Sequence, residues 1–433
     1  MRFNRYVEMR YLKDLEICFL INYLSGDVIS LPMDEEVCMD ALMQALDDDS
    51  IAYLKERGFL LEDDQEDLTH DEIFLSYQKN KDVLHLILLP NENCNFRCTY
   101  CYENFNHYRY DEAMIAAIKK LLVKEIDQYQ NLFLEYFGGE PLLESDTIVE
   151  LNTYAKALCQ QKHKKFFSHI TTNGYLLDLE NLKRLCASGV KTFTITIDGD
   201  QKTHDQTRVL ANGKGTYANI MANLEAAHHS DAAFKMKIRC NVTSQNADGI
   251  HRLVSELHER FQGDARFRDV NIRSVKDYNQ CVDDKSMLLN EQKAKQRVDA
   301  LLNYAMSLHL YDLSLPVCFQ LSGNVCYASD HFSYIIGGDG TIMKCSIDLR
   351  ENEENIIGYL KDDGTMVIDT QKEKRWTHTK EETICKDCIR YPSCLNLSCA
   401  KARNDGYHNV CPGIFKDFDF SLEQLYNQVN DEA

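Results

Sequence analysis

Apolar and polar positions follow two different periods along the middle of the chain. Between about residues 80 and 275, short apolar runs typical of strands recur six times, and segments with helical spacing separate them. The predicted strands are 83–89, 132–137, 166–172, 192–197, 235–242 and 269–275, and the predicted helices are 111–127, 145–163, 178–187, 215–228 and 246–261. Strands joined by helical crossovers form parallel sheets. We therefore predict an α/β fold with a partial (β/α)6 barrel, whose chemistry lies at the C-terminal ends of the strands.

The flanking sequence changes pattern. Residues 17–32 predict two strands around a Ser-Gly-Asp turn, residues 33–46 predict a helix, and residues 51–61 predict a short helix, a glycine stop and a strand. The predicted segments are a small N-terminal module at 1–75, the barrel at 80–275, a linker and helix at 276–315, a cysteine-rich region at 316–415 and a C-terminal helix at 416–433. The charged run at 62–72 is expected to be a linker.

Charge and composition exclude several functional classes. The 433 residues carry a net charge of −20, which argues against a partner that needs many phosphate contacts, so no nucleic acid is expected. No apolar run has the roughly 18–20 residues that span a bilayer, and the N-terminus lacks the apolar core of a signal peptide. We expect a cytoplasmic protein without a membrane domain.

Seventeen cysteines require an explanation. In a reducing compartment, clustered cysteines bind metal or do redox chemistry more often than they form disulfides. Cys94, Cys98 and Cys101 form a C-x3-C-x2-C group directly after the first predicted barrel strand. Three thiolates on one loop can hold three irons of a four-iron cluster and leave the fourth open. From spacing alone, an incomplete zinc site or a chance group of buried cysteines remains an alternative.

This group resembles the signature of the radical S-adenosylmethionine (SAM) superfamily, in which an aromatic residue precedes the last cysteine, as Tyr100 does here. The segment YFGGEPLL at 136–143 follows the second strand and resembles the GGEP motif of that family. The resemblance implies that Gly138, Gly139, Glu140 and Pro141 lie at the cofactor. Two glycines allow close backbone approach, the glutamate offers an acceptor for an ammonium group, and the proline stiffens the turn.

Later strand ends carry weaker matches. TTNGYLL at 171–177 and TITIDGDQKTHDQTR at 194–208 are similar to further segments of the family, with Thr196 in place of the common serine. By that resemblance Asn173, Thr196 and Arg208 are candidates to contact the ribose or carboxylate of SAM. Each could equally be a turn or capping residue.

The C-terminal cysteines form a third group. Cys326 and Cys345 are separated by x13-Gly-x4, and the spacing C-x2-C-x5-C-x4-C-x11-C follows. A zinc ribbon is the alternative interpretation of such C-x2-C turns. In context the region resembles the SPASM extension, which holds two auxiliary four-iron clusters, although the x4 and x11 spacings depart from the family pattern. The resemblance implies Cys326, Cys345, Cys399 and a plausible Cys318 for the first auxiliary cluster, and Cys385, Cys388, Cys394 and Cys411 for the second.

Together these resemblances imply a radical SAM/SPASM peptide maturase with three 4Fe-4S clusters and SAM as cofactors. Residues 1–75 are similar in pattern to winged-helix modules that bind a leader peptide by adding it to a sheet edge. The implied partners are a precursor peptide with a leader sequence and an electron donor such as flavodoxin or ferredoxin. The implied reaction is hydrogen-atom abstraction followed by a thioether or carbon–carbon crosslink. The alternatives are an anaerobic sulfatase maturase, which makes formylglycine, and a non-catalytic zinc-binding adaptor.

Overall fold

The computed structural model describes residues 1–80, 82–105, 107–280, 282–378, 383–408 and 410–432. The chain divides into two compact units. Unit 1 comprises Met1–Asn80, Ser314–His331 and Lys374–Ala433, and unit 2 comprises Lys81–Leu313 and Phe332–Glu373. The units therefore cut across the predicted 316–415 region, because part of that region joins the barrel sheet. Within the described ranges, no helix has the length and apolar character needed to cross a bilayer.

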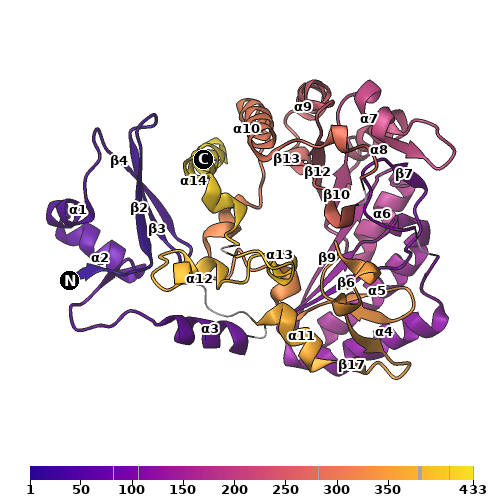
Figure 1. Cartoon of the computed structure of the whole chain (residues 1–433), viewed down its shortest axis with the longest axis horizontal. Helices are drawn as coiled ribbons and strands as arrows, with labels where there is room; N and C mark the ends of the chain where they lie inside the picture. Colours follow the sequence, from indigo (N-terminus) through magenta and orange to yellow (C-terminus); the bar gives the residue numbers. More distant parts are fainter. Residues whose placement is uncertain (81, 106, 281, 379–382, 409, 433) are drawn as a thin grey trace. The chain divides into compact units, whose positions relative to one another are not determined.

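Unit 2 contains a ten-stranded sheet with the order β13-β12-β10-β9-β8-β6-β14-β15-β16-β17 (Figure 1). Its strands are β6 (Val83–Leu88), β8 (Asn131–Tyr136), β9 (Lys165–Thr172), β10 (Thr192–Thr196), β12 (Lys235–Val242), β13 (Asp269–Ser274), β14 (Ser333–Ile336), β15 (Thr341–Met343), β16 (Ile356–Leu360) and β17 (Met366–Ile368). The six predicted strands are confirmed as parallel neighbours in sequence order. The sheet does not close on itself: β13 and β17 lie at its two ends.

Helices cover one face of this sheet. The helices of unit 2 are α4 (Glu112–Glu125), α5 (Ser145–Gln161), α6 (Leu179–Ser188), α7 (Gln201–Thr207), α8 (Tyr217–His228), α9 (Ala247–Phe261) and α10 (Glu291–Ser307), and α11 (Thr370–Thr377) spans the boundary between the units. Leu132, Leu134 and Tyr136 of β8 are fully buried, and the Tyr136 hydroxyl donates to Asn152 of α5 at 3.0 Å. Alternate positions of the same strand therefore face away from the helices.

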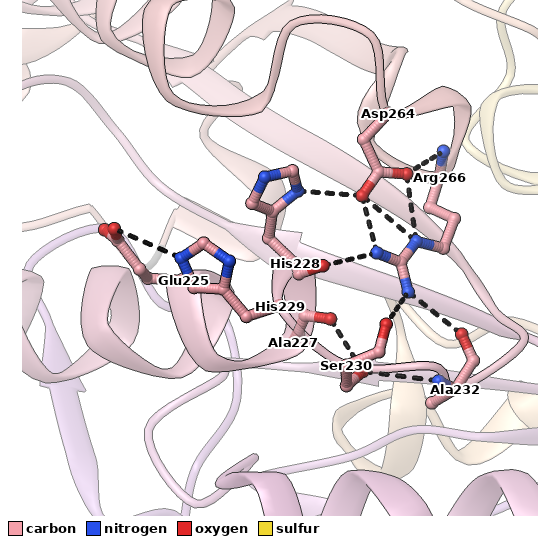
Figure 2. Close-up of polar contacts among 8 residues, drawn as sticks. All are labelled: Glu225, Ala227, His228, His229, Ser230, Ala232, Asp264 and Arg266. Atoms are coloured by element: carbon pink, nitrogen blue, oxygen red, sulfur yellow. Dashed lines mark hydrogen bonds and ion pairs between the residues drawn. The ribbon is translucent and has the colours of Figure 1, made fainter.

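A polar joint connects the chain before β12 to the chain before β13 (Figure 2). Arg266 donates to the Asp264 carboxylate and to the carbonyl oxygens of His228, Ser230 and Ala232. Burial raises the pKa of Asp264, but hydrogen bonds from Arg266 and His228 outweigh it and lower the pKa to about 2. The guanidinium of Arg266 thus connects the end of α8 and the turn after it to Asp264. We assign these contacts a role in the stability of unit 2 rather than in catalysis.

Unit 1 is built on a three-stranded antiparallel sheet of order β2-β3-β4. Its elements are β1 (Arg2–Phe3), β2 (Val7–Leu12), β3 (Ile17–Asn22), β4 (Val28–Pro32), β5 (Leu60–Leu61), α1 (Met39–Ala45), α2 (Asp48–Glu56), α3 (His70–Lys79), α12 (Tyr391–Cys394), α13 (Ala400–Asn404) and α14 (Phe418–Glu432). Residues of α1 and α2 pack on one face of the sheet, and residues of α14 pack on the other (Figure 1).

Two features of unit 1 differ from the prediction. Helix α3 occupies part of the predicted linker, because Thr69 and Glu72 form a capping box that starts a helix there. The predicted N-terminal module also shares a core with the C-terminal cysteine region: Tyr6 and Ile73 cluster with Tyr391, Leu395 and Leu397. That core joins segments more than 300 residues apart, so the local hydrophobic pattern does not reveal it.

Candidate functional site

The first cysteine group lies on the segment that follows β6. Cys98 ends the short strand β7 (Phe96–Cys98), which pairs antiparallel with β11 (Arg208–Leu210) and places Cys98 opposite Arg208. The Cys101 N–H donates to the Cys98 carbonyl at 3.1 Å, so the chain turns tightly between the second and third thiols. The predicted triad and the predicted Arg208 therefore meet in one place, although more than 100 residues separate them.

The three thiols share a low-polarity environment. Burial raises the pKa of Cys94 to about 12 and also raises the pKa values of Cys98 and Cys101. The thiols would repel one another as thiolates, so a cationic group is needed to keep them ionised at neutral pH. Two donors already point at the Cys94 sulfur, from the Phe96 N–H at 3.3 Å and the Asn173 amide at 3.8 Å. Buried thiols with hydrogen-bond donors to sulfur suit an iron–sulfur cluster.

A site for a single metal ion would need several ligands that point to one centre. In the parts of the chain that the structure describes, no group of three or more His, Cys, Asp or Glu side chains is arranged to hold one metal ion. The ligands of a four-iron cluster bind separate irons, so they need not converge on a single point.

The GGEP-like turn packs against the cysteine loop. Gly138 and Gly139 have φ values of +84° and +45°, and a Cβ on Gly139 would lie 2.1 Å from the Asn93 carbonyl oxygen. Only glycine fits this approach, which places the end of β8 beside the residue before Cys94. The Gly139 N–H donates to Glu103 at 2.5 Å, and the buried Pro141 begins a short 3-10 turn.

The Glu140 carboxylate is fully buried and bound by the protein itself. It accepts hydrogen bonds from Thr172 Oγ1 at 2.6 Å, from the Asn173 N–H at 2.7 Å and from the Leu142 N–H at 2.9 Å. Burial raises the pKa of Glu140, and these donors oppose the rise. The carboxylate thus ties the end of β8 to the end of β9, and its predicted contact with an ammonium group stays a prediction.

A buried network behind the thiols was only partly visible in the sequence. The Tyr100 hydroxyl donates to the Asp198 carboxylate and accepts from Arg208 Nη1 at 3.0 Å and from the Asn241 amide at 3.3 Å. Burial raises the pKa of Asp198, although Arg208 opposes it. The Arg208 Nε is buried and has no hydrogen-bond acceptor among the described residues. That free donor beside the thiols fits a cofactor with a carboxylate, which is the group expected of SAM.

Asn173 and Thr196 occupy different surroundings. The Asn173 side chain donates to Asn95 Oδ1 at 2.8 Å and accepts from the Tyr175 N–H at 3.0 Å, so it braces the cysteine loop. Thr196 is the last residue of β10 and pairs with Arg239 of β12. The structure therefore places Asn173 next to the thiols and Thr196 at a strand end, and their cofactor contacts remain predictions.

Polar side chains line the sheet face opposite the helices, and the sequence reasoning passed over most of them. His85 Nε2 lies 3.1 Å from Glu135 Oε2, and His169 lies within 2.9 Å of Thr192 Oγ1 and 3.2 Å of Thr194 Oγ1. Burial lowers the pKa of His169, which favours the neutral imidazole. The sequence did contain a signal for this polar face. TFTIT and KMKIRCNV alternate polar and apolar residues, and in the structure the apolar positions are buried while the polar positions are at most partly buried.

The C-terminal half of this face continues the network. Arg239 Nη1 donates to Asn271 Oδ1 at 2.8 Å, and Lys237 Nζ lies 3.4 Å from Asp269 and 3.7 Å from Asp312. Burial raises the pKa of Asp269 to about 6, an effect that Lys237 opposes and Asp312 reinforces. The open face of the sheet therefore offers both charges and amides to a polar substrate.

The second predicted auxiliary set comes together in unit 1. Cys394 interacts electrostatically with Cys388, Cys385 and Cys411, and Cys388 interacts with Cys411. Burial raises the pKa of Cys394 to about 12. The Cys388 N–H donates to the Cys385 carbonyl at 3.2 Å, as in a tight C-x2-C turn. Thiolates are ligands of both iron–sulfur clusters and zinc, and the role of these four cysteines as cluster ligands stays a prediction.

The first predicted auxiliary set is divided between the units. Cys326 and Cys399 lie in unit 1 and interact electrostatically, and Cys318 in the same unit has its sulfur 3.8 Å from the Ser314 carbonyl oxygen. Cys345 is buried in unit 2. The proposed ligand role of Cys318 and Cys345 stays a prediction.

The sequence comparisons agree with the geometry of the triad. Residues 88–238 match the profile of the Radical SAM superfamily, a segment that includes the three cysteines, the GGEP-like turn and Arg208. A cysteine-type anaerobic sulfatase-maturating enzyme of Clostridium novyi is 24% identical over 344 residues, which cover 76% of this chain and 91% of that enzyme. The chain therefore carries a radical SAM domain, which uses SAM and an iron–sulfur cluster, and it is an enzyme.

Two solved structures share its fold. Native anSMEcpe with bound SAM and the Kp18Cys peptide aligns with a TM-score of 0.60 at 18% identity and covers 81% of this chain and 98% of its own. Streptococcus suis SuiB bound to the precursor peptide SuiA aligns with a TM-score of 0.54 at 14% identity and covers 94% of this chain and 97% of its own.

Proposed function

We propose that this radical SAM enzyme modifies a ribosomally made precursor peptide and installs a thioether or carbon–carbon crosslink. One observation carries the proposal: the likeness to SuiB, a protein solved with its precursor peptide, extends over nearly the whole chain. The likeness to anSMEcpe leaves out a larger share. Both neighbours were solved with a bound peptide, which supports a peptide as the substrate of this enzyme.

The residues of the candidate site have different roles in this proposal. Cys94, Cys98 and Cys101 would hold the radical cluster, and Arg208 would bind the carboxylate of SAM through its free Nε. When bound, SAM and its cluster supply a 5′-deoxyadenosyl radical that removes a hydrogen atom from the substrate. The polar face of β6 to β13 would orient the peptide. The pKa values of His169 and Glu135 are lowered, so a neutral imidazole and an ionised carboxylate would be available there as proton acceptors.

The auxiliary cysteines would supply an electron acceptor. The proposed ligands of the first cluster are Cys326, Cys345, Cys399 and Cys318, and those of the second are Cys385, Cys388, Cys394 and Cys411. Formation of a crosslink removes two hydrogen atoms from the peptide. The radical takes the first as a hydrogen atom, and the second leaves afterwards as one proton and one electron. A flavodoxin or ferredoxin would supply the electrons that reduce the radical cluster.

The leader peptide would bind to unit 1. Strand β4 pairs only with β3 among the described strands, and its residues are partly buried or exposed. A strand with one unpaired edge accepts an extended peptide through main-chain hydrogen bonds. This mode requires no specific side chain on β4, which agrees with the absence of a recognisable motif in VISLP.

Sulfatase maturation is the second candidate, because the sulfatase-maturating relative covers most of the chain and was found by sequence alone. The two functions differ in product. The test uses protein purified without oxygen, SAM and dithionite, with either a synthetic cysteine peptide of sulfatase type or short peptides encoded beside the gene, followed by mass spectrometry.

Loss of two hydrogen atoms from a leader-bearing peptide, and not from the same peptide without its leader, is the expected result. Formylglycine in the sulfatase-type peptide, with no change in any leader-bearing peptide, would replace the proposal with the second candidate.

A further inference from the structure

Arg403 of unit 1 lies among cysteines from distant parts of the chain. It belongs to α13, the short helix that starts directly after Cys399, and its N–H donates to the Cys399 carbonyl at 3.3 Å. Its guanidinium donates through Nη2 to Ser329 Oγ at 2.9 Å and to the Trp376 carbonyl at 3.3 Å. Two polar contacts therefore fix the plane of the guanidinium.

The other terminal nitrogen of Arg403 is unused. Nη1 is buried and finds no hydrogen-bond acceptor among the residues that the structure describes. The groups that act on the guanidinium electrostatically are the thiols of Cys326, Cys399 and Cys394. A buried N–H of a charged group that lacks an acceptor destabilises the fold, because the group has lost its hydrogen bonds to water. An anion beside the thiols would remove that destabilisation.

Arg390 provides a contrast within the same unit. It follows the C-x2-C turn and interacts electrostatically with Cys388, but Glu8 of β2 accepts from its Nε at 2.6 Å and from its Nη2 at 2.5 Å. Phe418 and Phe415 lie against its guanidinium, 4.0 Å and 4.9 Å from the ring centres. Glu8 neutralises the charge of Arg390, whereas Arg403 presents its charge to the thiols.

We propose that Arg403 is a positioning residue of the auxiliary iron–sulfur site at Cys326 and Cys399: its Nη1 donates a hydrogen bond to a sulfur of the bound cluster, and its charge favours the reduced state. This inference rests on the auxiliary clusters of the proposed function. Each electron added to a cluster increases its negative charge, and hydrogen bonds to its sulfurs are among the factors that set its potential. The cluster beside Arg403 is thereby easier to reduce than it would be with a neutral residue there.

The test uses full-length protein carrying Cys94→Ala, Cys98→Ala and Cys101→Ala, so that only auxiliary clusters remain. Arg403→Gln, Arg403→Lys and the control Arg10→Gln are compared in this parent after anaerobic reconstitution. Arg10 belongs to the same unit but pairs with Asp419 at the surface. Iron and sulfide content, a redox titration followed by electron paramagnetic resonance, and the melting temperature of the metal-free protein are measured.

Arg403→Gln is expected to keep its iron but to shift one auxiliary reduction equilibrium about tenfold toward the oxidised state, which is about 59 mV for one electron. Arg403→Lys restores most of the shift, and Arg10→Gln shows none. Iron loss in Arg403→Gln that Arg403→Lys rescues also supports the proposal.

An unchanged potential with full iron in Arg403→Gln overturns the role of Arg403 alone. Iron loss in both Arg403 variants, together with a lower melting temperature of the metal-free protein, shows a packing role and overturns it too. A parent that binds no iron refutes the auxiliary clusters, and this inference with them.

Discussion

The two cysteine regions of the protein are stabilised in different ways. The radical triad lies on the segment after a parallel strand, where the ends of β8, β9, β10 and β12 bring Glu140, Asn173, Asp198 and Asn241 around it. The C-terminal cysteines lie on short turns and helices that gain order from a core shared with Tyr6 and with Ile73 of α3. The first site is organised by one continuous sheet, and the second by segments from both ends of the chain.

This difference has a functional consequence. Radical chemistry needs a fixed distance between cofactor and substrate, and strand ends of a packed sheet provide it. The C-terminal cysteines would need a defined environment for the electron transfer proposed for them, which a smaller core can provide. Because the same core includes residues of the N-terminal module, the peptide binding proposed at that module would be physically connected to the order of the C-terminal cysteines.

Removing the radical triad should have the largest effect. In the otherwise wild-type protein, Cys94→Ala, Cys98→Ala and Cys101→Ala together should lower iron from about twelve to about eight per chain and abolish formation of 5′-deoxyadenosine. Iron analysis and chromatography of the SAM products check this. Cys186→Ala, a change at a solitary cysteine on α6, is the control and should alter neither quantity. Stoichiometric zinc with no iron in the wild type would instead favour the adaptor hypothesis.

Breaking the Glu8–Arg390 pair should unfold unit 1 more easily. Glu8→Ala leaves the mostly buried Arg390 without its partner and Tyr23 without its acceptor, which should lower the free energy of unfolding by about 3–5 kcal/mol. The single tryptophan, Trp376, is fully buried in unit 1, so its fluorescence during denaturation reports on this unit.

The matched control for that experiment is Arg10→Ala. Its pair with Asp419 is about half exposed on both sides, and its loss should cost less than about 1 kcal/mol. Equal effects of the two substitutions would contradict the shared core as the source of order at the C-terminal cysteines.

Two carboxylates of unit 2, Asp269 and Asp264, should affect its stability in different pH ranges. The pKa of Asp269 is raised to about 6, so its contribution to stability is complete below about pH 4 and is lost as the pH rises through about 6. Asp269→Asn should remove a decline of about 2–3 kcal/mol between those values, measured by denaturation followed by circular dichroism.

Asp264 is the control, because its pKa is lowered to about 2. Its contribution is present above about pH 4 and is lost only as the pH falls through about 2. Asp264→Asn should therefore leave the slope between pH 4 and pH 6 unchanged. The same slope in the wild type and in Asp269→Asn would show that the polar face of the sheet is more hydrated than its burial indicates.

Replacing Arg208 should have the smallest effect of these changes, a weaker binding of SAM. Arg208→Lys keeps the charge but loses the planar donor array and the contact with Tyr100, which should weaken SAM binding about tenfold, or about 1.4 kcal/mol. Equilibrium binding of SAM to reconstituted protein checks it. Arg184→Lys, at an exposed pair with Asp146, should leave the affinity unchanged. Unaltered binding in Arg208→Lys would remove Arg208 from the proposed cofactor site.

The parallel strands and the helices between them were predictable from the sequence because their signals are local. All six predicted strands and the five predicted helices between them are present within a few residues of their predicted bounds. The hydrophobic pattern did not predict the strands whose place depends on pairing with distant parts of the chain. Strand β2 was not predicted, and β14–β17 were expected in a separate region but extend the barrel sheet through β6.

The sequence by itself determined the alternation of strands and helices, the radical SAM motifs at successive strand ends, and the glycines that let the GGEP-like turn touch the cysteine loop. These depend on residues close in the chain, whose spacing is preserved in the fold. Only the tertiary structure decided that Glu140 binds Thr172, that Tyr100 joins Asp198 to Arg208, and that cysteines distant in the sequence act electrostatically on Arg403. Those contacts connect residues tens to hundreds of positions apart, and folding brings them together without leaving a regular spacing in the sequence.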